Sequence, residues 1–336
     1  MRILITGAAG FIGSELALKL LERAQTVIGV DNHNNYYDPA LKEARLARHL
    51  YHESYTHVRC DISARQALEK VFSEHKPQVV VNLAAQAGVQ YSINNPSTYV
   101  KSNLKGFLNV LELCRKFKVE HLVYASSSSV YGANEKMPLS AHDSVDHPLS
   151  LYAATKKANE LMAHTYSHLY DIPTTGLRFF TVYGPWGRPD MAIFKFTKAI
   201  QSDEKIQLHN FGNHERDFTY IDDIIEGVIR VLKKIPKENK RWDGKKPDPG
   251  TSFAPWRLYN IGNNNPIKIT KVIGILEREI GKKAILDLVP LRAGDVLKTF
   301  ADIDDLKSEF SYKPATPLET GVSRFVDWYL EYYNYK

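Results

Sequence analysis

Short runs of aliphatic and β-branched residues alternate with amphipathic stretches through the first 180 residues of the chain. Uninterrupted apolar runs of this length are typical of strands buried on both faces of a sheet, and the stretches between them have helical spacing. The pattern predicts six strands, over residues 2–6, 26–30, 56–60, 79–83, 122–126 and 174–180. Strands that alternate with helices favour an α/β fold with a Rossmann-type, doubly wound parallel sheet.

Helices are predicted over residues 12–23 and 64–75, and the second of these begins with Ser63-Ala-Arg-Gln66, the pattern of a capping box. A further helix over residues 222–234 and a strand over 257–261 have the same character, and residues 236–255 are rich in Lys, Pro, Asp and Gly, which predicts an exposed loop. We therefore expect a larger, discontinuous domain from residues 1–180 and 217–262. A smaller C-terminal α/β lobe, from residues 181–216 and 263–336, would lie over its strand ends.

The composition is that of an ordinary globular protein, with 336 residues, of which 43% are hydrophobic and 24% charged. No run reaches the roughly 18 apolar residues of a membrane helix, and two cysteines in different segments are typical of a reduced cytoplasm. The net charge of +6 comes from dispersed basic residues, which do not indicate nucleic acid, and a small anionic substrate explains the mild excess equally well. His164 and His168 share the spacing of a metal pair, but two exposed polar residues explain them as well, and we expect no metal site.

Three glycines, Gly7, Gly10 and Gly13, follow the first predicted strand and precede a helix that begins near Phe11. A turn without side chains lets the backbone approach a pyrophosphate, and the free N–H groups of the following helix can bind it. A purely structural turn would also use glycine, but the position between the first strand and its helix favours a dinucleotide.

Acidic residues end the next two predicted strands. Asp31 lies where a carboxylate accepts hydrogen bonds from the adenosine ribose and repels a 2′-phosphate, which favours NAD over NADP. Asp61 could hold the edge of the adenine, although an Asp before a Ser is also ordinary turn chemistry. The alternative for Asp31 is a cap on a helix or turn.

Tyr152 and Lys156 are four residues apart and therefore share one face of a predicted helix. A phenol with a pKa near ~10 is a poor base at neutral pH, but a nearby ammonium and a nicotinium ring would both lower that pKa. The pair could then remove a hydroxyl proton while a hydride leaves the same carbon. This spacing is common by itself, and the glycine turn, Asp31 and the serine run at residues 126–129 favour a catalytic role.

Longer motifs then identify a family. The chain resembles the extended short-chain dehydrogenases/reductases of the nucleotide-sugar epimerase/dehydratase group over nearly its whole length. Within that group it is most similar to the UDP-glucuronate 4-epimerases, through "GVDNHNNYYDPALKEARL", "AAQAGVQYSINNP", "RFFTVYGPWGRPDMAIFKFTKAI" and "RDFTYIDDI". The resemblance implies an isomerase with tightly held NAD, a UDP-sugar substrate and a homodimer formed through the helices over residues 97–115 and 152–170.

The resemblance also implies a set of site residues. Catalysis would fall to Ser127, five residues before the Gly of "VYG", to the base Tyr152 and to Lys156. Besides Tyr152 and Lys156, the residues expected to bind NAD are Gly7, Gly10, Phe11, Ile12, Gly13, Asp31, Asn32, Asp61, Ile62, Leu83, Ala84, Ala85, Gln86 and Asn103. The diphosphate would be bound by Arg216 and Arg292, the uridine by Met191, Leu208 and Asn210, and the sugar by Ser128, Ser129, Thr181 and Arg188, with Asp295 in the same substrate set.

The serines narrow the reaction. Related dehydratases and decarboxylases carry Asp or Glu directly after the catalytic hydroxyl, whereas this chain has Ser128 and Ser129, which favours return of the hydride to the opposite face of C4. A 4-keto glucuronate tends to lose carbon dioxide, and hydroxyl donors can hold its carboxylate out of alignment with the ketone. Gln90 replaces the Arg of the family's "AGVRYS", so epimerisation of UDP-glucose or UDP-N-acetylglucosamine is the leading alternative. A dehydratase or decarboxylase, and a non-catalytic dinucleotide-binding protein, are the remaining ones.

Overall fold

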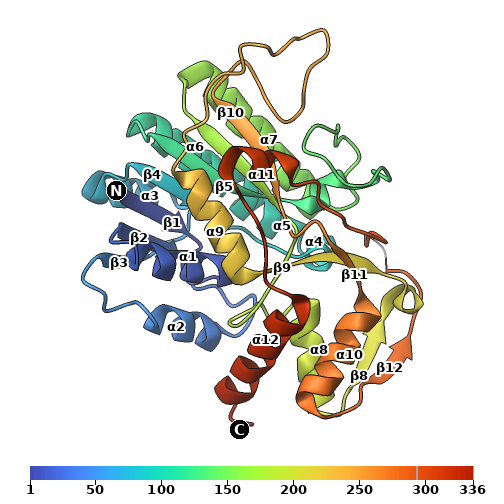
Figure 1. The fold of residues 1–336 in the computed structure, drawn as a ribbon. Coiled ribbons are helices and arrows are strands. Elements are labelled where there is room, and N and C mark those ends of the chain that lie inside the picture. The colour runs from blue at the N-terminus through green and yellow to red at the C-terminus, as the bar shows by residue number, and fades with distance from the viewer. Residues whose placement is uncertain (293, 336) are drawn as a thin grey trace.

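The computed structural model describes residues 1–292 and 294–335 and contains a seven-stranded parallel sheet in the order β10-β6-β5-β4-β1-β2-β3 (Figure 1). The strands of this sheet are β1 (Arg2–Thr6), β2 (Thr26–Asp31), β3 (Tyr55–Arg59), β4 (Val79–Asn82), β5 (His121–Ser127), β6 (Thr174–Phe179) and β10 (Trp256–Ile261). Every strand predicted for residues 1–180, and the one at 257–261, is present with its ends moved by no more than one residue. The predicted α/β, doubly wound fold is confirmed.

Two apolar cores lie on opposite faces of this sheet, because successive side chains of a strand point to opposite sides. In β1, Ile3 and Ile5 join the core that includes α1 (Phe11–Leu21) and α9 (Ile221–Leu232). Leu4 joins the core formed with α3 (Arg65–His75), α6 (Phe107–Lys116) and α7 (Leu151–Tyr170). Burial on both faces explains why the strands are continuously apolar rather than alternating.

The remaining elements around this sheet are short. They are α2 (Pro39–Ala47), α4 (Val89–Asn94), α5 (Pro96–Tyr99), the π-helix η1 (Val100–Gly106), the 3-10 helix η2 (Ser128–Tyr131) and α11 (Asp304–Phe310). Among the described residues, no helix has the length and apolar character needed to cross a membrane. Cys60 and Cys114 are both buried free thiols.

The capping box predicted at Ser63–Gln66 is wrong. Helix α3 begins at Arg65, and its N-cap residue Ala64 makes no side-chain cap. The Asp61 carboxylate accepts a hydrogen bond from the Ser63 N–H at 2.9 Å and so forms a turn one residue earlier. Asx turns of this kind compete with capping for the same backbone donors.

A second group of elements packs beside the carboxyl ends of the sheet (Figure 1). It contains β7 (Thr181–Tyr183), α8 (Ala192–Gln201), β8 (Lys205–Leu208), the 3-10 helix η3 (His209–Gly212), β9 (Glu215–Tyr220), β11 (Pro266–Lys268), α10 (Ile269–Ile280), β12 (Ile285–Leu288) and α12 (Leu318–Tyr332). Strands β11, β9 and β7 form a three-stranded sheet, β12 pairs with β8, and α10 packs against both α8 and α12. Segments from before and after β10 therefore build this region together.

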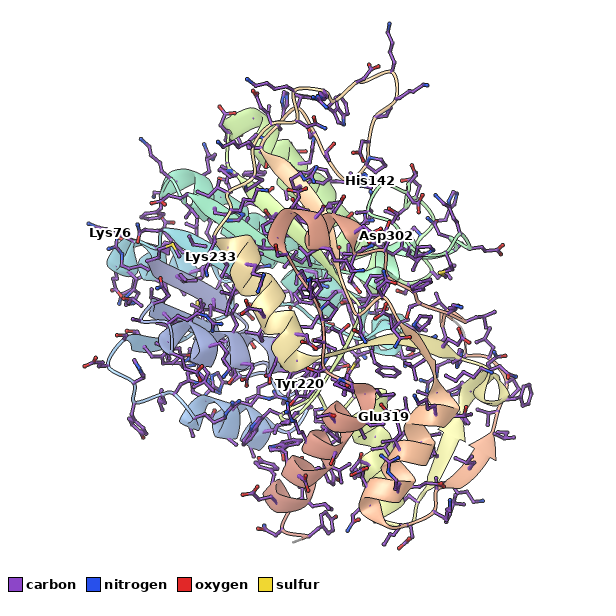
Figure 2. All side chains as sticks on the ribbon, in the orientation of Figure 1. Lys76, His142, Tyr220, Lys233, Asp302 and Glu319 are labelled. Carbon is purple, nitrogen blue, oxygen red and sulfur yellow. The ribbon has the colours of Figure 1, made fainter. Side chains whose placement is uncertain are left out.

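One histidine connects its own loop to the loop at residues 236–255 and to α11. His142 lies beside α11 (Figure 2), and its ring nitrogens bond to Asp248 at 2.7 Å and to Asp305 at 2.9 Å. Asp248 belongs to the loop at residues 236–255, which contains no helix or strand, as predicted. The two carboxylates hold this loop and α11 to the segment that carries His142.

Candidate active site

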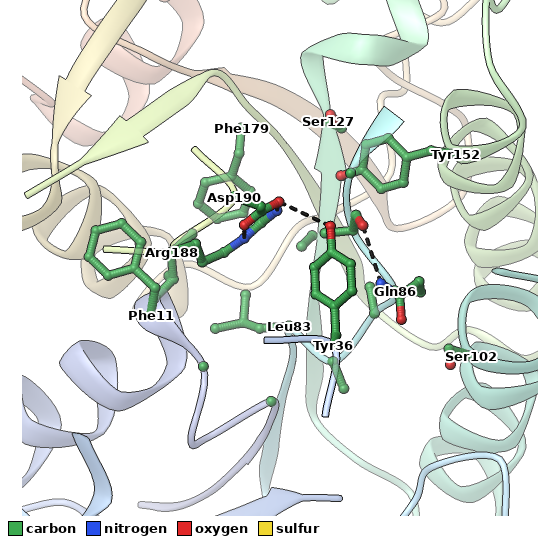
Figure 3. Close-up of a pocket in the computed structure, with 18 of the residues that line it drawn as sticks. Phe11, Tyr36, Leu83, Gln86, Ser102, Ser127, Tyr152, Phe179, Arg188 and Asp190 are labelled. Carbon is green, nitrogen blue, oxygen red and sulfur yellow. Dashed lines mark hydrogen bonds and ion pairs between the residues drawn. The ribbon is translucent and has the colours of Figure 1, made fainter. Parts of the chain in front are cut away.

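The main cavity lies at the carboxyl ends of the central strands and has a volume of about 530 Å³ (Figure 3). Strand β1 has β2 on one side and β4 on the other, so the cavity opens where the direction of the chain's winding changes, the usual ligand site of such sheets. The predicted site residues that line it are Gly7, Gly10, Phe11, Ile12, Gly13, Asp31, Asn32, Asp61, Ile62, Leu83, Ala84, Ala85, Gln86, Ser127, Ser128, Ser129, Tyr152, Lys156, Thr181, Arg188, Met191, Arg292 and Asp295.

The glycine turn leaves no room for side chains. Gly7 has a φ of +74°, and a Cβ on Gly13 would lie 2.1 Å from the Gly7 carbonyl oxygen. Gly10 caps α1 without a side-chain hydrogen bond, so the first N–H groups of the helix face the cavity with no protein cap. This cradle fits the pyrophosphate of a dinucleotide.

Asp31 fixes both the glycine turn and the loop after β2. One carboxylate oxygen accepts from the Ala9 N–H at 3.1 Å, and the other accepts from the His33 N–H at 2.8 Å. Each oxygen has a second lone pair, so ribose hydroxyls could still donate to it. The residues at this end of the cavity therefore fit the adenosine of NAD.

The surroundings of Asp61 favour its charged form. Burial would raise the pKa of its carboxyl, but hydrogen bonds from Ser63 and from the side chains of Lys101 and Asn32 outweigh burial and lower it. The Lys101 ammonium lies 3.2 Å from the carboxylate. Asp61 thus offers a persistent acceptor at the cavity wall.

Asn103 does not line the cavity, although it was predicted to bind the cofactor. Its side chain is buried, accepts from the Gln86 N–H at 2.8 Å and donates to the Gln86 carbonyl at 3.0 Å and to Thr155 at 3.0 Å. These contacts hold the segment after β4 against α7. Asn103 therefore supports the cavity wall at Gln86 without lining the cavity itself.

Tyr152 and Lys156 lie on the first turns of α7, and Tyr152 lies beside Ser127 at the end of β5 (Figure 3). Burial raises the pKa of Tyr152, while a side-chain hydrogen bond with Ser127 and the charge of Arg188 act in the opposite direction. Burial also lowers the pKa of Lys156 to about 8, with the Glu160 charge opposing it. The two pKa values therefore move apart, because burial favours the neutral form of both the phenol and the amine.

The charge that acts on Tyr152 differs from the expected one. We predicted that the Lys156 ammonium lowers the phenol pKa, but in this structure the cation acting on Tyr152 is Arg188. The Lys156 Nζ instead donates to the Ala125 carbonyl at 2.8 Å. A hydrogen bond to a backbone carbonyl fixes the direction of the ammonium.

The four serines have different surroundings. Ser126 is buried and donates to the Glu160 carboxylate at 2.6 Å, and Glu160 in turn pairs with Arg178 at 2.8 and 2.9 Å. Ser127 accepts from the Ser129 N–H at 3.2 Å, and η2 begins at Ser128. All four serines line the cavity, and Ser126 also joins β5 to α7 and β6 through Glu160.

Two residues that line the cavity were missed from the sequence. Asp190 receives two hydrogen bonds from Arg188, and the Tyr36 hydroxyl donates to Asp190 at 3.1 Å (Figure 3). Burial would raise the pKa of Asp190, but the charge and hydrogen bonds of Arg188 lower it. Tyr36 stands in "NNYYDP" and Asp190 directly follows "GRP", so the family motifs contained a signal that we did not use.

Three predicted substrate residues lie outside the main cavity, within the second region. Leu208 is buried at the end of β8, and Asn210 donates to the Asn213 carbonyl at 2.8 Å. Arg216 donates to the carbonyls of Glu215 and Leu297 at 3.0 and 3.1 Å. Burial lowers the pKa of Arg216 and the charge of Asp295, which does line the cavity, raises it, so Arg216 lies close to the cavity wall.

Comparisons with known proteins agree with this geometry. Residues 3–242 match the NAD dependent epimerase/dehydratase family. The chain is 57% identical to protein CapI of Staphylococcus aureus over 99% of both chains, and 46% identical to a probable UDP-glucuronate 4-epimerase of Rhizobium meliloti over 99% of this chain and 98% of that protein. A crystal structure of UDP-glucuronic acid 4-epimerase from Bacillus cereus, in complex with UDP-glucuronic acid and NAD, has a TM-score of 0.86 at 32% identity and covers 99% of this chain and 100% of that chain.

Proposed function

The chain belongs to the NAD dependent epimerase/dehydratase family, and we propose that it is an isomerase that converts UDP-glucuronate to UDP-galacturonate by epimerisation at C4. This membership confirms the resemblance predicted from the sequence motifs. The observation that carries the proposal is one cavity lined by Ser127, Tyr152 and Lys156 together with Arg188, in which the positions after Ser127 are serines and not acids.

We propose that the glycine turn, Asp31, Asp61 and the segment at residues 83–86 hold NAD. Bound there, NAD supplies an acceptor and donor for the C4 hydride. Tyr152 removes the proton of the C4 hydroxyl, and Ser127 orients that hydroxyl through its bond with the phenol. Lys156 fixes the ribose of the cofactor, and Tyr152 returns the proton when the hydride comes back to the other face of the ketone.

The uronate carboxylate must be kept on the sugar while the ketone exists. We propose that Ser128, Ser129 and Thr181 donate hydrogen bonds to it and that Arg188 adds a charge-assisted contact. These donors would hold the carboxylate away from the alignment in which carbon dioxide leaves. The positions directly after Ser127 are serines, which are poor acids, and this makes elimination at C5 unfavourable.

The nucleotide would stay anchored while the sugar turns over. We propose that Arg216 and Arg292 bind the diphosphate, since guanidinium forks pair two phosphate oxygens at once. Met191, Leu208, Asn210 and Asp295 would complete the uridine end. Leu208 and Asn210 do not line the cavity, so their part of the proposal requires the second region to adjust around the nucleotide, whereas Arg216 lies close to the cavity wall.

The expected division into domains and the expected dimer remain proposals. Residues 1–180 and 217–262 would form the NAD domain, and residues 181–216 and 263–336 the substrate domain. A homodimer through α6 and α7 is supported by exposed apolar side chains on these helices, at Leu108, Leu161 and Leu169. Buried free thiols support a location in the cytoplasm.

Incubation with UDP-glucuronate alone tests the function, because the cofactor is regenerated in each turnover. Proton NMR should show UDP-galacturonate, and the Tyr152→Phe variant should form none. UDP-glucose and UDP-N-acetylglucosamine, run in parallel, test the alternative raised by Gln90, which lines the cavity with a neutral side chain. If NAD-loaded protein left UDP-glucuronate unchanged and epimerised a neutral sugar, the uronate assignment would be wrong.

A further inference from the structure

A hydrogen-bonded bridge crosses the cavity between two distant parts of the chain. Tyr36, in the loop after β2, donates to one oxygen of Asp190, which lies between β7 and α8. The same carboxylate pairs with Arg188 on the opposite side (Figure 3). All three side chains line the cavity.

The bridge fixes one edge of the Arg188 guanidinium. Its Nε donates to one Asp190 oxygen at 2.9 Å, and its Nη2 donates to the other at 2.5 Å. A guanidinium has five N–H donors in a rigid plane, so two are used and the end formed by Nη1 and the second Nη2 hydrogen stays available. That end matches the geometry of a second carboxylate.

The Tyr36 ring is itself held from several sides. It packs edge-on against Tyr91 at 4.9 Å between ring centroids. Its hydroxyl lies so close to Gly88 that a Cβ at that position would come within 2.6 Å. A rotation of Asp190 would therefore break a contact with a side chain that has little freedom to follow.

We infer that Tyr36 and Asp190 are positioning residues that orient Arg188 for the sugar carboxylate and thereby keep the 4-keto uronate from losing carbon dioxide. This inference rests on the proposed uronate epimerase function. Because Asp190 holds Nε and Nη2, Arg188 presents Nη1 and the second Nη2 hydrogen to the substrate in one fixed direction. Without the bridge the guanidinium can rotate, and the carboxylate it holds can reach the alignment with the C4 ketone.

Product partition measures this orientation directly. When the carboxylate aligns, the C5–C6 bond breaks and carbon dioxide leaves with C6. The bonding pair becomes the enolate of the C4 ketone, and a solvent proton added at C5 completes a 4-keto pentose. Affinity for the uronate is a poorer measure for Asp190→Asn, because removal of the Asp190 charge also leaves Arg188 more attractive to any carboxylate.

The experiment compares Asp190→Asn and Tyr36→Phe with wild type on UDP-glucuronate, with UDP-pentose and UDP-galacturonate quantified by NMR. Loss of a charge-assisted hydrogen bond should raise the pentose share about tenfold or more in Asp190→Asn, and Tyr36→Phe should raise it less. Two matched controls lie outside the cavity. Tyr259→Phe also removes a tyrosine hydroxyl bonded to a carboxylate, that of Glu309 at 2.9 Å, and Asp203→Asn removes an ion pair of 2.9 Å with Lys282. Both should keep the wild-type partition.

A binding arm needs no turnover. Tyr36→Phe changes no charge, so by calorimetry its dissociation constant for UDP-glucuronate should rise about threefold or more, while that for UDP-glucose stays unchanged. Equal changes for the two nucleotides, or no change in partition for either cavity variant, would overturn the inference. If wild type forms no UDP-galacturonate, the proposed function fails and the binding arm still decides whether the bridge orients Arg188.

Discussion

Replacement of Glu160 with Gln should weaken both the fold and the catalytic helix. The Glu160 and Arg178 side chains are 1% and 0% exposed, and Glu160 accepts two hydrogen bonds from Arg178 and one from Ser126. Removing one partner of a buried pair typically costs about 3–5 kcal/mol, because the other charge is left uncompensated. Since Gln keeps one acceptor oxygen, we expect a loss near the lower end, about 3 kcal/mol of the free energy of unfolding.

Urea denaturation at fixed NAD concentration measures this loss. With an m value of about 3 kcal/mol per molar, the midpoint should fall by about 1 M. The control is the double variant Glu160→Leu with Arg178→Met, which removes both charges and should lose less than either single variant. A single-variant loss below about 1 kcal/mol, or a double loss equal to the sum of the two single losses, would refute the reasoning about an uncompensated buried charge.

The same variant should move the pH dependence of activity. Burial lowers the pKa of Lys156 to about 8, and the Glu160 charge is the effect that raises it. Without that charge the Lys156 pKa should fall further, so a smaller fraction of the Lys156 amines carries a proton at neutral pH. The high-pH decline of kcat should therefore begin at lower pH in Glu160→Gln, and an unchanged profile would mean that Lys156 titration does not limit turnover.

Three further changes test other parts of the structure. Gly13→Ala places a Cβ 2.1 Å from the Gly7 carbonyl oxygen, so it should cost about 1–3 kcal/mol of stability and abolish NAD retention, measured as NAD released on denaturation; normal retention would contradict the cradle. Ser129→Glu should repel the uronate and raise the KM for UDP-glucuronate about tenfold or divert it to a pentose, and unchanged kinetics would remove Ser129 from the carboxylate site. His142 has its pKa raised to about 9, chiefly by its hydrogen bond to Asp305, against about 6.5 when unfolded. The contribution of His142 to the free energy of unfolding is thus complete below pH 6.5 and is lost as the pH rises through 9. Because the side chain is 44% exposed, this contribution should stay below about 1 kcal/mol. The difference in melting temperature between wild type and His142→Gln should therefore vanish above pH 9, and a difference that persists there would contradict the reasoning.

The sheet could be predicted from the sequence because burial on both faces leaves a plain signature. Strands such as Val79–Asn82 are wholly apolar until the last residue, and the glycines at the first turn are required by contacts too close for a Cβ. These are local demands, and each can be read from a few consecutive residues. The division between the two cores follows because successive side chains of each strand point to opposite faces of the sheet.

The polar contacts that cross the cavity could not be predicted in this way. Tyr36 and Asp190 are 154 residues apart, and nothing in either segment alone specifies that they meet. Likewise, the spacing of Tyr152 and Lys156 predicts a shared helical face but not that the ammonium binds the Ala125 carbonyl. Long-range hydrogen bonds depend on how elements pack, which a local pattern does not encode.

The position of β10 limits how this protein can diversify. Strand β10 forms the edge of the central sheet next to β6, while α8 and β8 come before it in the chain and α10, β12 and α12, which pack with them, come after it. No single crossover in a gene could therefore exchange this second region for that of a relative while keeping the central sheet intact. New substrate preferences in such a chain should therefore arise by point substitution. The cavity-lining positions Ser128, Ser129 and Gln90 are places where such substitutions would act.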